Sequence, residues 1–291
     1  MKILLLGPNG QLGTDIRAAN DKLSRPHEIV PLDRAAVDLS DIEAASAAIS
    51  QLDFDLLVNG SSYHKTDEVE KNAQLGFTIN AHLVERLARI AGEKKARLIH
   101  VSTDYVFGGQ PERAPLAENN GKAPLNVYGA SKAMGEDLAL MTGANVTVLR
   151  VASLFGVAGA SGKGGNFVET MIRFGRERGA LKVVADQIMS PTATIDIADA
   201  LFRMVDKGAF GGVWHVVNSG QASWHEFAAR IIDRAGVAAT VTPIPSSEFP
   251  TPAKRPPYSV LDNAKLVGAI GPVRHWHEAL DAYLAAKGYG V

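Results

Sequence analysis

Residues 1–13 read Met-Lys-Ile-Leu-Leu-Leu-Gly-Pro-Asn-Gly-Gln-Leu-Gly, an apolar run followed by three evenly spaced glycines. The run predicts a buried strand, and Gly7, Gly10 and Gly13 predict a tight turn that opens a helix. Glycine allows the backbone to approach a pyrophosphate, whose charge is met by the free N–H groups of the helix N-terminus. The first two glycines are one residue further apart than in the commonest fingerprint. The stretch favours a dinucleotide-binding loop, with a purely structural strand-to-helix turn as the alternative.

Short apolar segments alternate with helical patterns through the first half of the chain. Strands are predicted at 2–6, 28–32, 55–59, 97–102 and 146–150. A helix is predicted at 75–91, where leucine or isoleucine at 75, 79, 83 and 87 forms one apolar stripe facing a sheet. This alternation is typical of a parallel sheet covered on both faces. The predicted fold class is α/β, with a Rossmann-type doubly wound parallel sheet.

The alternation loosens after Arg150. A glycine-rich stretch at 156–165 and a proline-rich stretch at 243–257 separate shorter elements, and such stretches suit either ligand-binding loops or surface linkers. We therefore predict a dinucleotide-binding domain at 1–150. A smaller C-terminal lobe at 151–291 is expected to be mainly substrate-binding, with some of its segments returning to the first domain.

The composition excludes several classes of function. The 291 residues include 30 basic and 31 acidic side chains and no cysteine. Scattered, balanced charge argues against a nucleic-acid partner, and the lack of cysteine excludes disulfides, Cys-ligated zinc and thiol nucleophiles. No apolar run approaches the roughly 20 residues of a membrane helix. We expect a cytoplasmic protein with no membrane partner, and a homodimer is left open.

Asp33 ends the predicted second strand, twenty positions after Gly13. An acidic side chain at this point can accept hydrogen bonds from the adenosine ribose of NAD, whereas the adjacent Arg34 can pair with the 2′-phosphate of NADP. An aspartate in a strand-ending turn is the structural alternative. These two residues leave NADH and NADPH both open.

Tyr128 and Lys132 lie four residues apart in a segment, 126–141, whose apolar spacing is helical. We expect the phenol and the ammonium to share a helix face, with the positive charge drawing the pKa of Tyr128 down toward the working range. Thr103 follows the strand at 97–102, at the sheet edge where ligands of open α/β folds bind. We predict that these three residues act together on a carbonyl oxygen. A chance pairing of Tyr128 and Lys132 on a solvated helix face is the alternative.

Further motifs stand in order along the chain. They are STDYVF at 102–107, PLNVYG at 124–129, NFV at 166–168, DQ at 186–187 with PT at 191–192, SWHEFA at 223–228 and PTPAKRP at 250–256. With the glycine loop, they resemble the dTDP-4-dehydrorhamnose reductase family of the extended short-chain dehydrogenase/reductase superfamily, over nearly the whole chain.

The resemblance implies that NADPH or NADH reduces the ketone of a nucleoside-diphosphate 4-keto-6-deoxy sugar, with dTDP-4-dehydrorhamnose converted to dTDP-L-rhamnose. It implies Tyr128 as the proton donor and Lys132 and Thr103 as its partners. Cofactor contacts are expected from Gly7, Gly10, Gln11, Leu12, Gly13, Asp33, Arg34, Asp38, Leu39, Ser62, Tyr63, His64 and Lys132. Substrate contacts are expected from Thr103, Asp104, Ser153, Asn166 and Arg255, whose guanidinium suits a diphosphate.

One stretch and two single positions depart from the family's pattern. The stretch at 59–64, Asn-Gly-Ser-Ser-Tyr-His, is more polar than the alanine-rich stretch usual there. Ser153 stands where the family usually has tryptophan, and Tyr258 stands where asparagine is usual. Loss of a large flat ring at 153 removes a packing surface for a sugar or base, so the sugar's identity is more open than the chemistry.

A dehydratase, an epimerase, a regulatory subunit and a metal enzyme are the alternatives to a reductase. A dehydratase needs Thr-Asp-Glu, because elimination requires an acid beside a carboxylate, and this chain has Thr103-Asp104-Tyr105. An epimerase with tightly bound NAD uses the same tyrosine and lysine, and a non-catalytic regulatory subunit like that of methionine adenosyltransferase resembles the same reductases. No metal site is expected, because His275 and His277, two apart, should lie on different sides of a helix.

Overall fold

The computed structural model describes residues 1–159 and 165–290, so the predicted loop at 156–165 lies partly outside the described residues. Within them, six parallel strands form the central sheet in the order β10-β5-β4-β3-β1-β2. The strands are β1 (Lys2–Leu6), β2 (Glu28–Leu32), β3 (Leu56–Asn59), β4 (Arg97–Thr103), β5 (Asn145–Val151) and β10 (Gly212–His215). The five strands predicted from the sequence all form, each within one residue of its expected bounds. The Rossmann-type doubly wound sheet is confirmed.

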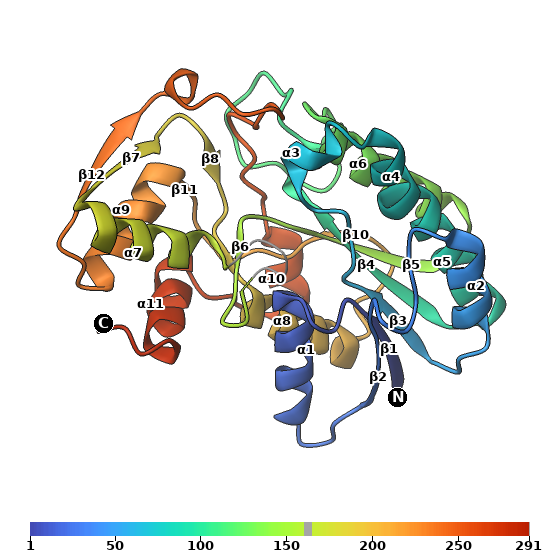
Figure 1. Cartoon of the computed structure of the whole chain (residues 1–291). Helices are drawn as coiled ribbons and strands as arrows, with labels where there is room; N and C mark the ends of the chain where they lie inside the picture. The colour runs from blue at the N-terminus through green and yellow to red at the C-terminus, as the bar shows by residue number, and fades with distance from the viewer. Residues whose placement is uncertain (160–164, 291) are drawn as a thin grey trace.

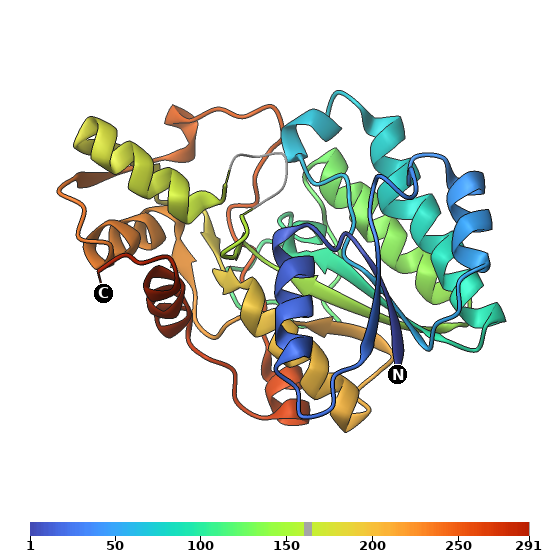
Figure 2. The same cartoon turned by 60° about the horizontal axis from the view of Figure 1, so that its bottom comes forward.

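Helices cover both faces of this sheet (Figure 1, Figure 2). Successive side chains of a strand point to opposite faces, so Ile3 and Leu5 pack in one core while Leu4 and Leu6 pack in the other. The first core is covered by α1 (Gln11–Asp21), α8 (Thr194–Lys207) and α10 (Ala264–Ile270). The second is covered by α2 (Ile42–Ser50), α5 (Leu83–Glu93) and α6 (Val127–Met141). The opening residues predict a strand that is apolar on both sides, and such a strand belongs in the interior of a sheet, between two other strands.

The order of the strands creates a crevice at β1, the strand next to the edge strand β2. β1 pairs with β2 on one side and with β3 on the other, so the winding of the chain reverses there. In open α/β sheets, ligands bind outside the carboxyl ends of the strands at such a reversal. The glycine loop follows β1 and the polar stretch at 60–65 follows β3, so the topology places both at this crevice.

The helix predicted at 75–91 is interrupted. It consists of α4 (Ala73–Phe77), a π-helical segment Thr78–His82 and α5, and the short α3 (Thr66–Val69) precedes it. A π turn holds more residues than an α turn, so the two helical pieces present different faces to the sheet. Leu83 and Leu87 are buried as predicted, but Leu75 is 38% exposed. The prediction of a single apolar stripe from 75 to 87 was therefore wrong, because the π-helical segment interrupts it.

A second group of elements packs beside the sheet (Figure 1). It contains β6 (Leu154–Phe155), β7 (Ala180–Val184), β8 (Ile188–Met189), β9 (Thr192–Ala193), β11 (Ala222–Ser223), β12 (Thr240–Ile244), α7 (Phe167–Arg178), α9 (Trp224–Arg234) and α11 (Trp276–Ala286). Its core is rich in aromatic rings, with Phe227 against Phe155, Phe167 and Trp276. The chain also returns to the sheet after residue 151, because β10, α8 and α10 belong to the central layers. None of the helices within the described ranges is long and apolar enough to cross a bilayer.

Candidate active site

The glycine loop brings backbone close to backbone between β1 and α1. Gly7 has a φ of +76°, which favours glycine, and a Cβ there would lie 3.1 Å from the carbonyl of Gly60. Gly10 precedes α1, and no side chain in the described part of the structure caps this helix. The N–H groups of its first turn are therefore available to an anion. The buried Oε1 of Gln11 also has no hydrogen-bond partner among the described residues. The close glycine backbone and the free N–H groups fit the pyrophosphate of a dinucleotide, whereas the Gln11 oxygen can only accept a hydrogen from a donor.

Replacing Gly13 with Ala is expected to destabilise the protein by about 1–3 kcal/mol, the usual cost of overpacking. A Cβ there would lie 2.2 Å from the carbonyl oxygen of Gly7, so the loop must shift. Gly10→Ala is the matched control, because its Cβ meets nothing nearer than 3.5 Å. The control should unfold at the wild-type urea concentration, yet bind dinucleotide more weakly because the methyl group occupies the cradle. Equal stability of the two variants would contradict this account of the loop.

The residues after β2 lie beside the glycine loop. Nδ2 of Asn9 donates to Oδ2 of Asp33 at 3.1 Å, and the other carboxylate oxygen accepts backbone N–H groups of its own turn. The structure thus shows Asp33 as a turn residue whose side chain also faces the glycine loop, and its contact with the adenosine ribose stays a prediction. Arg34 and Asp38 are exposed, and Leu39 packs partly against the core. Asp33, Arg34, Asp38 and Leu39 all follow the carboxyl end of β2, the edge strand next to β1.

The residues after β3 complete this side of the crevice. Ser62, Tyr63 and His64 are partly exposed and follow the Gly60 backbone that approaches Gly7. Asn80 of the π-helical segment holds Tyr63 at both backbone groups, accepting its N–H at 2.8 Å and donating to its carbonyl at 3.1 Å. The structure therefore brings the predicted cofactor residues of β1, β2 and β3 to one crevice.

Thr103 and Tyr128 meet where β4 ends and α6 begins. The first turn of α6 is capped by Asn126, which accepts the N–H of Gly129 at 2.7 Å. That glycine lies against the turn after β4, since a Cβ on it would be 2.1 Å from the carbonyl oxygen of Tyr105. The rings of Tyr105 and Tyr128 stand edge to face with centroids 5.9 Å apart. This packing positions the phenol of Tyr128 beside the hydroxyl of Thr103.

The predicted effect of Lys132 on Tyr128 was wrong. Burial raises the pKa of Tyr128 to about 12, a hydrogen bond with Thr103 offsets part of that rise, and the charge of Asp104 adds to it. Nζ of Lys132 is held against β4, where it donates to the carbonyl oxygen of Val101 at 2.6 Å. Burial lowers the pKa of Lys132 to about 7. The rise in the pKa of Tyr128 therefore comes from burial, and the charge of Lys132 does not offset it.

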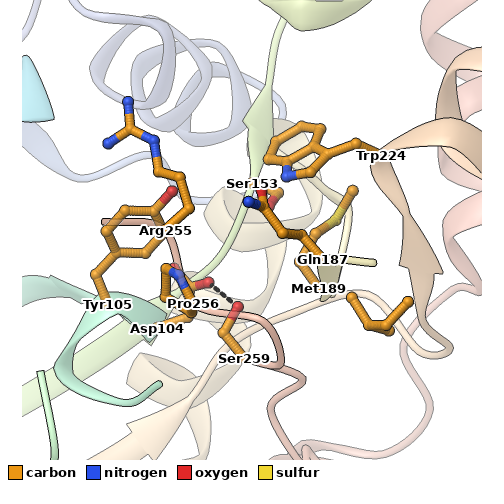
Figure 3. A pocket seen from close by; sticks show the side chains of 10 residues that line it. Asp104, Tyr105, Ser153, Gln187, Met189, Trp224, Arg255, Pro256 and Ser259 are labelled. Carbon is orange, nitrogen blue, oxygen red and sulfur yellow. Dashed lines mark hydrogen bonds between the residues drawn. The ribbon is translucent and has the colours of Figure 1, made fainter. Parts of the chain in front are cut away.

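A pocket opens between the turn after β4 and the second group of elements (Figure 3). It is lined by Asp104, Tyr105, Ser153, Gln187, Ile188, Met189, Trp224, Arg255, Pro256 and Ser259. Ser153 has a φ of +45°, unusual for a residue with a side chain. Nη2 of Arg255 is paired with Asp67 of α3 at 2.7 Å, while its buried Nη1 has no partner within the described residues. The pocket thus offers one guanidinium NH₂ group for an anionic ligand.

Replacing Asp104 with Asn is expected to flatten the pH dependence of stability. Burial raises the pKa of this carboxyl from 3.8 to about 6, although Ser259 and Thr103 both donate to it, at 2.6 and 3.1 Å. The folded state therefore holds the proton more tightly than the unfolded state. This contribution to stability is present below about pH 4 and is lost as the pH rises to about 6, an effect of about 3 kcal/mol. Urea unfolding across this range checks it. A wild-type slope retained in Asp104→Asn would remove Asp104 as its source.

Asn166 lies away from this pocket. It caps α7 by accepting the N–H of Glu169 at 3.1 Å, and its amide donates to Gly156 and Tyr283. These contacts join Asn166 to other parts of the protein. Its predicted contact with substrate stays a prediction.

The two histidines near the C-terminus are in contact. His275 is the N-cap of α11 and accepts the N–H of His277, with ring centroids 4.5 Å apart. Their expected separation was wrong, because a cap residue lies outside the helical periodicity. Among the residues that the structure describes, no group of three His, Cys, Asp or Glu side chains is placed to hold a metal ion.

Sequence reasoning missed several residues of the site. Gln187, Met189 and Trp224 reach the pocket from the second group of elements. Gln187 and Trp224 stand in the motifs at 186–187 and 223–228, but the motifs alone did not assign them to the site. His100 contacts Lys132, with Nε2 3.0 Å from Nζ. One signal for it was present, because His100 is a polar residue between Leu98-Ile99 and Val101, in the apolar middle of the strand.

Comparisons with known proteins agree with this geometry. The chain is 32% identical to the spore coat polysaccharide biosynthesis protein SpsK of Bacillus subtilis, covering 98% of each chain. It is 35% identical to the dTDP-4-dehydrorhamnose reductase of Burkholderia thailandensis, covering 93% of each. The crystal structure of the dTDP-4-dehydrorhamnose reductase of Bacillus anthracis in complex with NADP matches with a TM-score of 0.89 at 32% identity, over 98% of this chain and 99% of that one. The family described as RmlD substrate binding domain matches residues 1–288. The chain therefore belongs to the RmlD substrate binding domain family.

Proposed function

We propose that this chain is a nicotinamide-dependent reductase of a nucleoside-diphosphate 4-keto-6-deoxy sugar, with dTDP-4-dehydrorhamnose as the substrate and dTDP-L-rhamnose as the product. The observation that carries the proposal is the meeting of Thr103 and Tyr128 between the glycine-loop crevice and the pocket of Asp104 and Arg255. The relatives that bear the name dTDP-4-dehydrorhamnose reductase support it.

Tyr128 is the proton donor in this proposal. A bound nicotinamide supplies the hydride for the ketone. Thr103 holds the substrate oxygen, and Tyr128 gives its phenolic hydrogen to the same oxygen as negative charge develops there. A tyrosine whose pKa is raised to about 12 is protonated at neutral pH, as a donor must be. Lys132 lies one helical turn after Tyr128 on α6 and holds the nicotinamide ribose.

The cofactor binds along the crevice, with its pyrophosphate on Gly10, Gln11 and Leu12 at the start of α1. The loops after β2 and β3 bind the adenosine portion. Arg34 is exposed beside Asp33 and is free to turn toward a 2′-phosphate, which supports NADPH as the cofactor. A relative of 32% identity was solved with NADP.

The nucleotide sugar occupies the pocket beside Tyr105. The unpartnered Nη1 of Arg255 binds its diphosphate, because a guanidinium matches phosphate geometry. Asp104 and Ser153 contact the sugar, and the indole of Trp224 supplies a flat apolar surface in a pocket where the family's usual tryptophan is replaced by Ser153. Residues 151–291 act mainly as the substrate-binding lobe over the domain formed by residues 1–150.

The decisive experiment mixes the purified chain with dTDP-4-dehydrorhamnose and either NADPH or NADH. We expect one mole of NADPH oxidised for each mole of dTDP-L-rhamnose formed, and slower oxidation of NADH. The UDP- and GDP-linked keto sugars serve as controls for the base. Isomerisation of the sugar without net oxidation would show an epimerase instead. Tight binding of cofactor and sugar with neither reaction would show a regulatory binding protein.

A further inference from the structure

Two hydroxyl groups hold the carboxylate of Asp104 in the pocket beside Tyr105. Oγ of Ser259 donates to its Oδ2 at 2.6 Å (Figure 3), and Oγ1 of Thr103 donates to its Oδ1 at 3.1 Å. Asp104 is 3% exposed, and it lines the pocket together with Ser259. A buried carboxylate that loses a donor is poorly stabilised. Each of the two hydroxyl groups is therefore restrained by the carboxylate that accepts its hydrogen.

Backbone hydrogen bonds to β8 fix the position of Ser259. Its N–H donates to the carbonyl oxygen of Ile188 at 2.9 Å, and the N–H of Ile188 donates to the carbonyl oxygen of Pro257 at 3.1 Å. The segment that carries Ser259 is therefore bound to a strand of the second group of elements. Its hydroxyl holds one oxygen of Asp104, and the other oxygen of the carboxylate faces Thr103.

Thr103 has one hydroxyl hydrogen, and two different acceptors require it. In the free protein the hydrogen goes to Oδ1 of Asp104, while Oγ1 of Thr103 accepts the N–H of Tyr105 at 3.1 Å. In the proposed reaction the same hydrogen goes to the ketone oxygen of the sugar. A hydroxyl can donate only once, so Thr103 must leave the carboxylate when it binds the ketone. A second donor must then take its place, or the buried carboxylate loses a hydrogen bond.

We propose that Asp104 is a specificity-determining residue that selects a ketone with a hydroxyl group on the adjacent carbon, and that Ser259 is the positioning residue that holds its carboxylate. The proposal rests on the proposed function, in which Thr103 holds the ketone oxygen. The adjacent hydroxyl of the sugar donates to Oδ1 of Asp104, which releases the hydrogen of Thr103 to the ketone. Oγ1 of Thr103 and Oδ1 of Asp104 are 3.1 Å apart. Oxygen atoms on adjacent carbons are separated by a similar distance, so one sugar reaches both groups.

The groups around Asp104 leave its carboxylate as an acceptor. Tyr105 and Tyr128 face it with phenols whose pKa values are raised by burial, so both phenols are neutral at neutral pH. Arg255 lines the same pocket, and its Nη2 is paired with Asp67 of α3. Burial raises the pKa of Asp104 to about 6, and the hydrogen bonds from the two hydroxyl groups limit the rise. At neutral pH the side chain is therefore mostly a carboxylate, which accepts hydrogen bonds and donates none.

The first test compares two substrates that differ by one hydroxyl group. They are dTDP-4-dehydrorhamnose and its 3-deoxy analogue, since carbon 3 is the neighbour of the ketone that carries a hydroxyl. We expect the wild-type kcat/KM for the analogue to be lower by about 10²-fold or more, because the buried carboxylate is left one donor short. In Asp104→Asn this preference should shrink by about 10-fold or more, because a neutral amide tolerates the missing donor better and its NH₂ can donate to Thr103.

Binding of the same two sugars separates this inference from the proposed function. Titration calorimetry without reduced cofactor measures their Kd values, and we expect the wild-type protein to bind the analogue more weakly. A protein that shows this difference but never oxidises NADPH would support the inference and overturn the reductase. Reductase activity with no preference between the two sugars, in kcat/KM or in Kd, would overturn the inference alone. A wild-type preference that Asp104→Asn retains in full would also overturn it.

The second test removes the hydroxyl that holds Asp104. In Ser259→Ala the pKa of Asp104 should rise, because the lost hydrogen bond favours the charged form. The sugar hydroxyl needs a carboxylate as its acceptor, so the acid limb of kcat/KM, expected near pH 6 in the wild type, should move to higher pH by about one unit. Ser190→Ala is the matched control, because its buried Oγ contacts the same segment at the N–H of Leu261, at 3.2 Å. A folded Ser259→Ala variant whose acid limb matches that of Ser190→Ala would overturn the role of Ser259.

Discussion

Tyr128→Phe is expected to lower kcat by about 10²- to 10⁴-fold, the usual contribution of a general acid. In the proposed mechanism the phenol of Tyr128 donates a hydrogen to the substrate oxygen, and a phenyl ring keeps the shape while removing that hydrogen. The Kd for NADPH should change little, since the ring stands edge to face with Tyr105 and that packing is retained. Single-turnover oxidation of NADPH and a fluorescence titration of cofactor binding measure the two quantities.

Tyr105→Phe is the matched control for Tyr128→Phe. It removes the phenolic hydroxyl from the other ring of the same pair and preserves the stacking. We expect it to retain turnover within a few-fold, because its hydroxyl is not beside Thr103. A Tyr128→Phe enzyme with wild-type kcat, or a Tyr105→Phe enzyme with the larger loss, would falsify the assignment of the proton donor.

Arg150→Met is expected to destabilise the protein by about 3–5 kcal/mol, because it removes the buried cation from a buried carboxylate and leaves only the more distant Lys122, at 3.6 Å. Nη2 of Arg150 lies 2.7 Å from Glu136, and the side chains of the pair are 3% and 0% exposed. Glu136 also accepts the hydroxyl of Ser102 at 2.5 Å. The pair therefore ties α6, which carries Tyr128, to β5 and β4, the strand that ends at Thr103. Urea unfolding at neutral pH measures the loss.

Two further variants show whether burial causes the effect of Arg150→Met. Arg89→Met breaks the pair with Glu85, whose members are 54% and 29% exposed, and should cost no more than about 1 kcal/mol. The double variant Arg150→Met with Glu136→Leu removes both charges and should recover much of the stability, since an apolar pair has no unpaired ion to bury. An Arg150→Met variant as stable as Arg89→Met would contradict this explanation.

The local sequence predicts the early strands of the sheet better than it predicts the late strand and the helices that cover the sheet. The five early strands are apolar on both faces or end in glycine or polar residues, so their bounds follow from composition and spacing alone. β10 was missed as a sheet strand, because it joins β5 from far along the chain. The π-helical segment Thr78–His82 was also missed, since hydrophobic spacing carries no sign of one extra residue per turn.

The sequence by itself determined the kinds of groups available: a glycine loop for an anion, and a tyrosine and a lysine one helical turn apart. Tertiary structure alone sets the direction in which their pKa values shift. Burial raises the pKa of Tyr128 and lowers that of Lys132, opposite to the expectation from their proximity. The imidazole of His100, on a strand thirty-two residues before Lys132, contacts its amine. Desolvation and long-range hydrogen bonds depend on which segments meet in space, and spacing along the chain does not encode them.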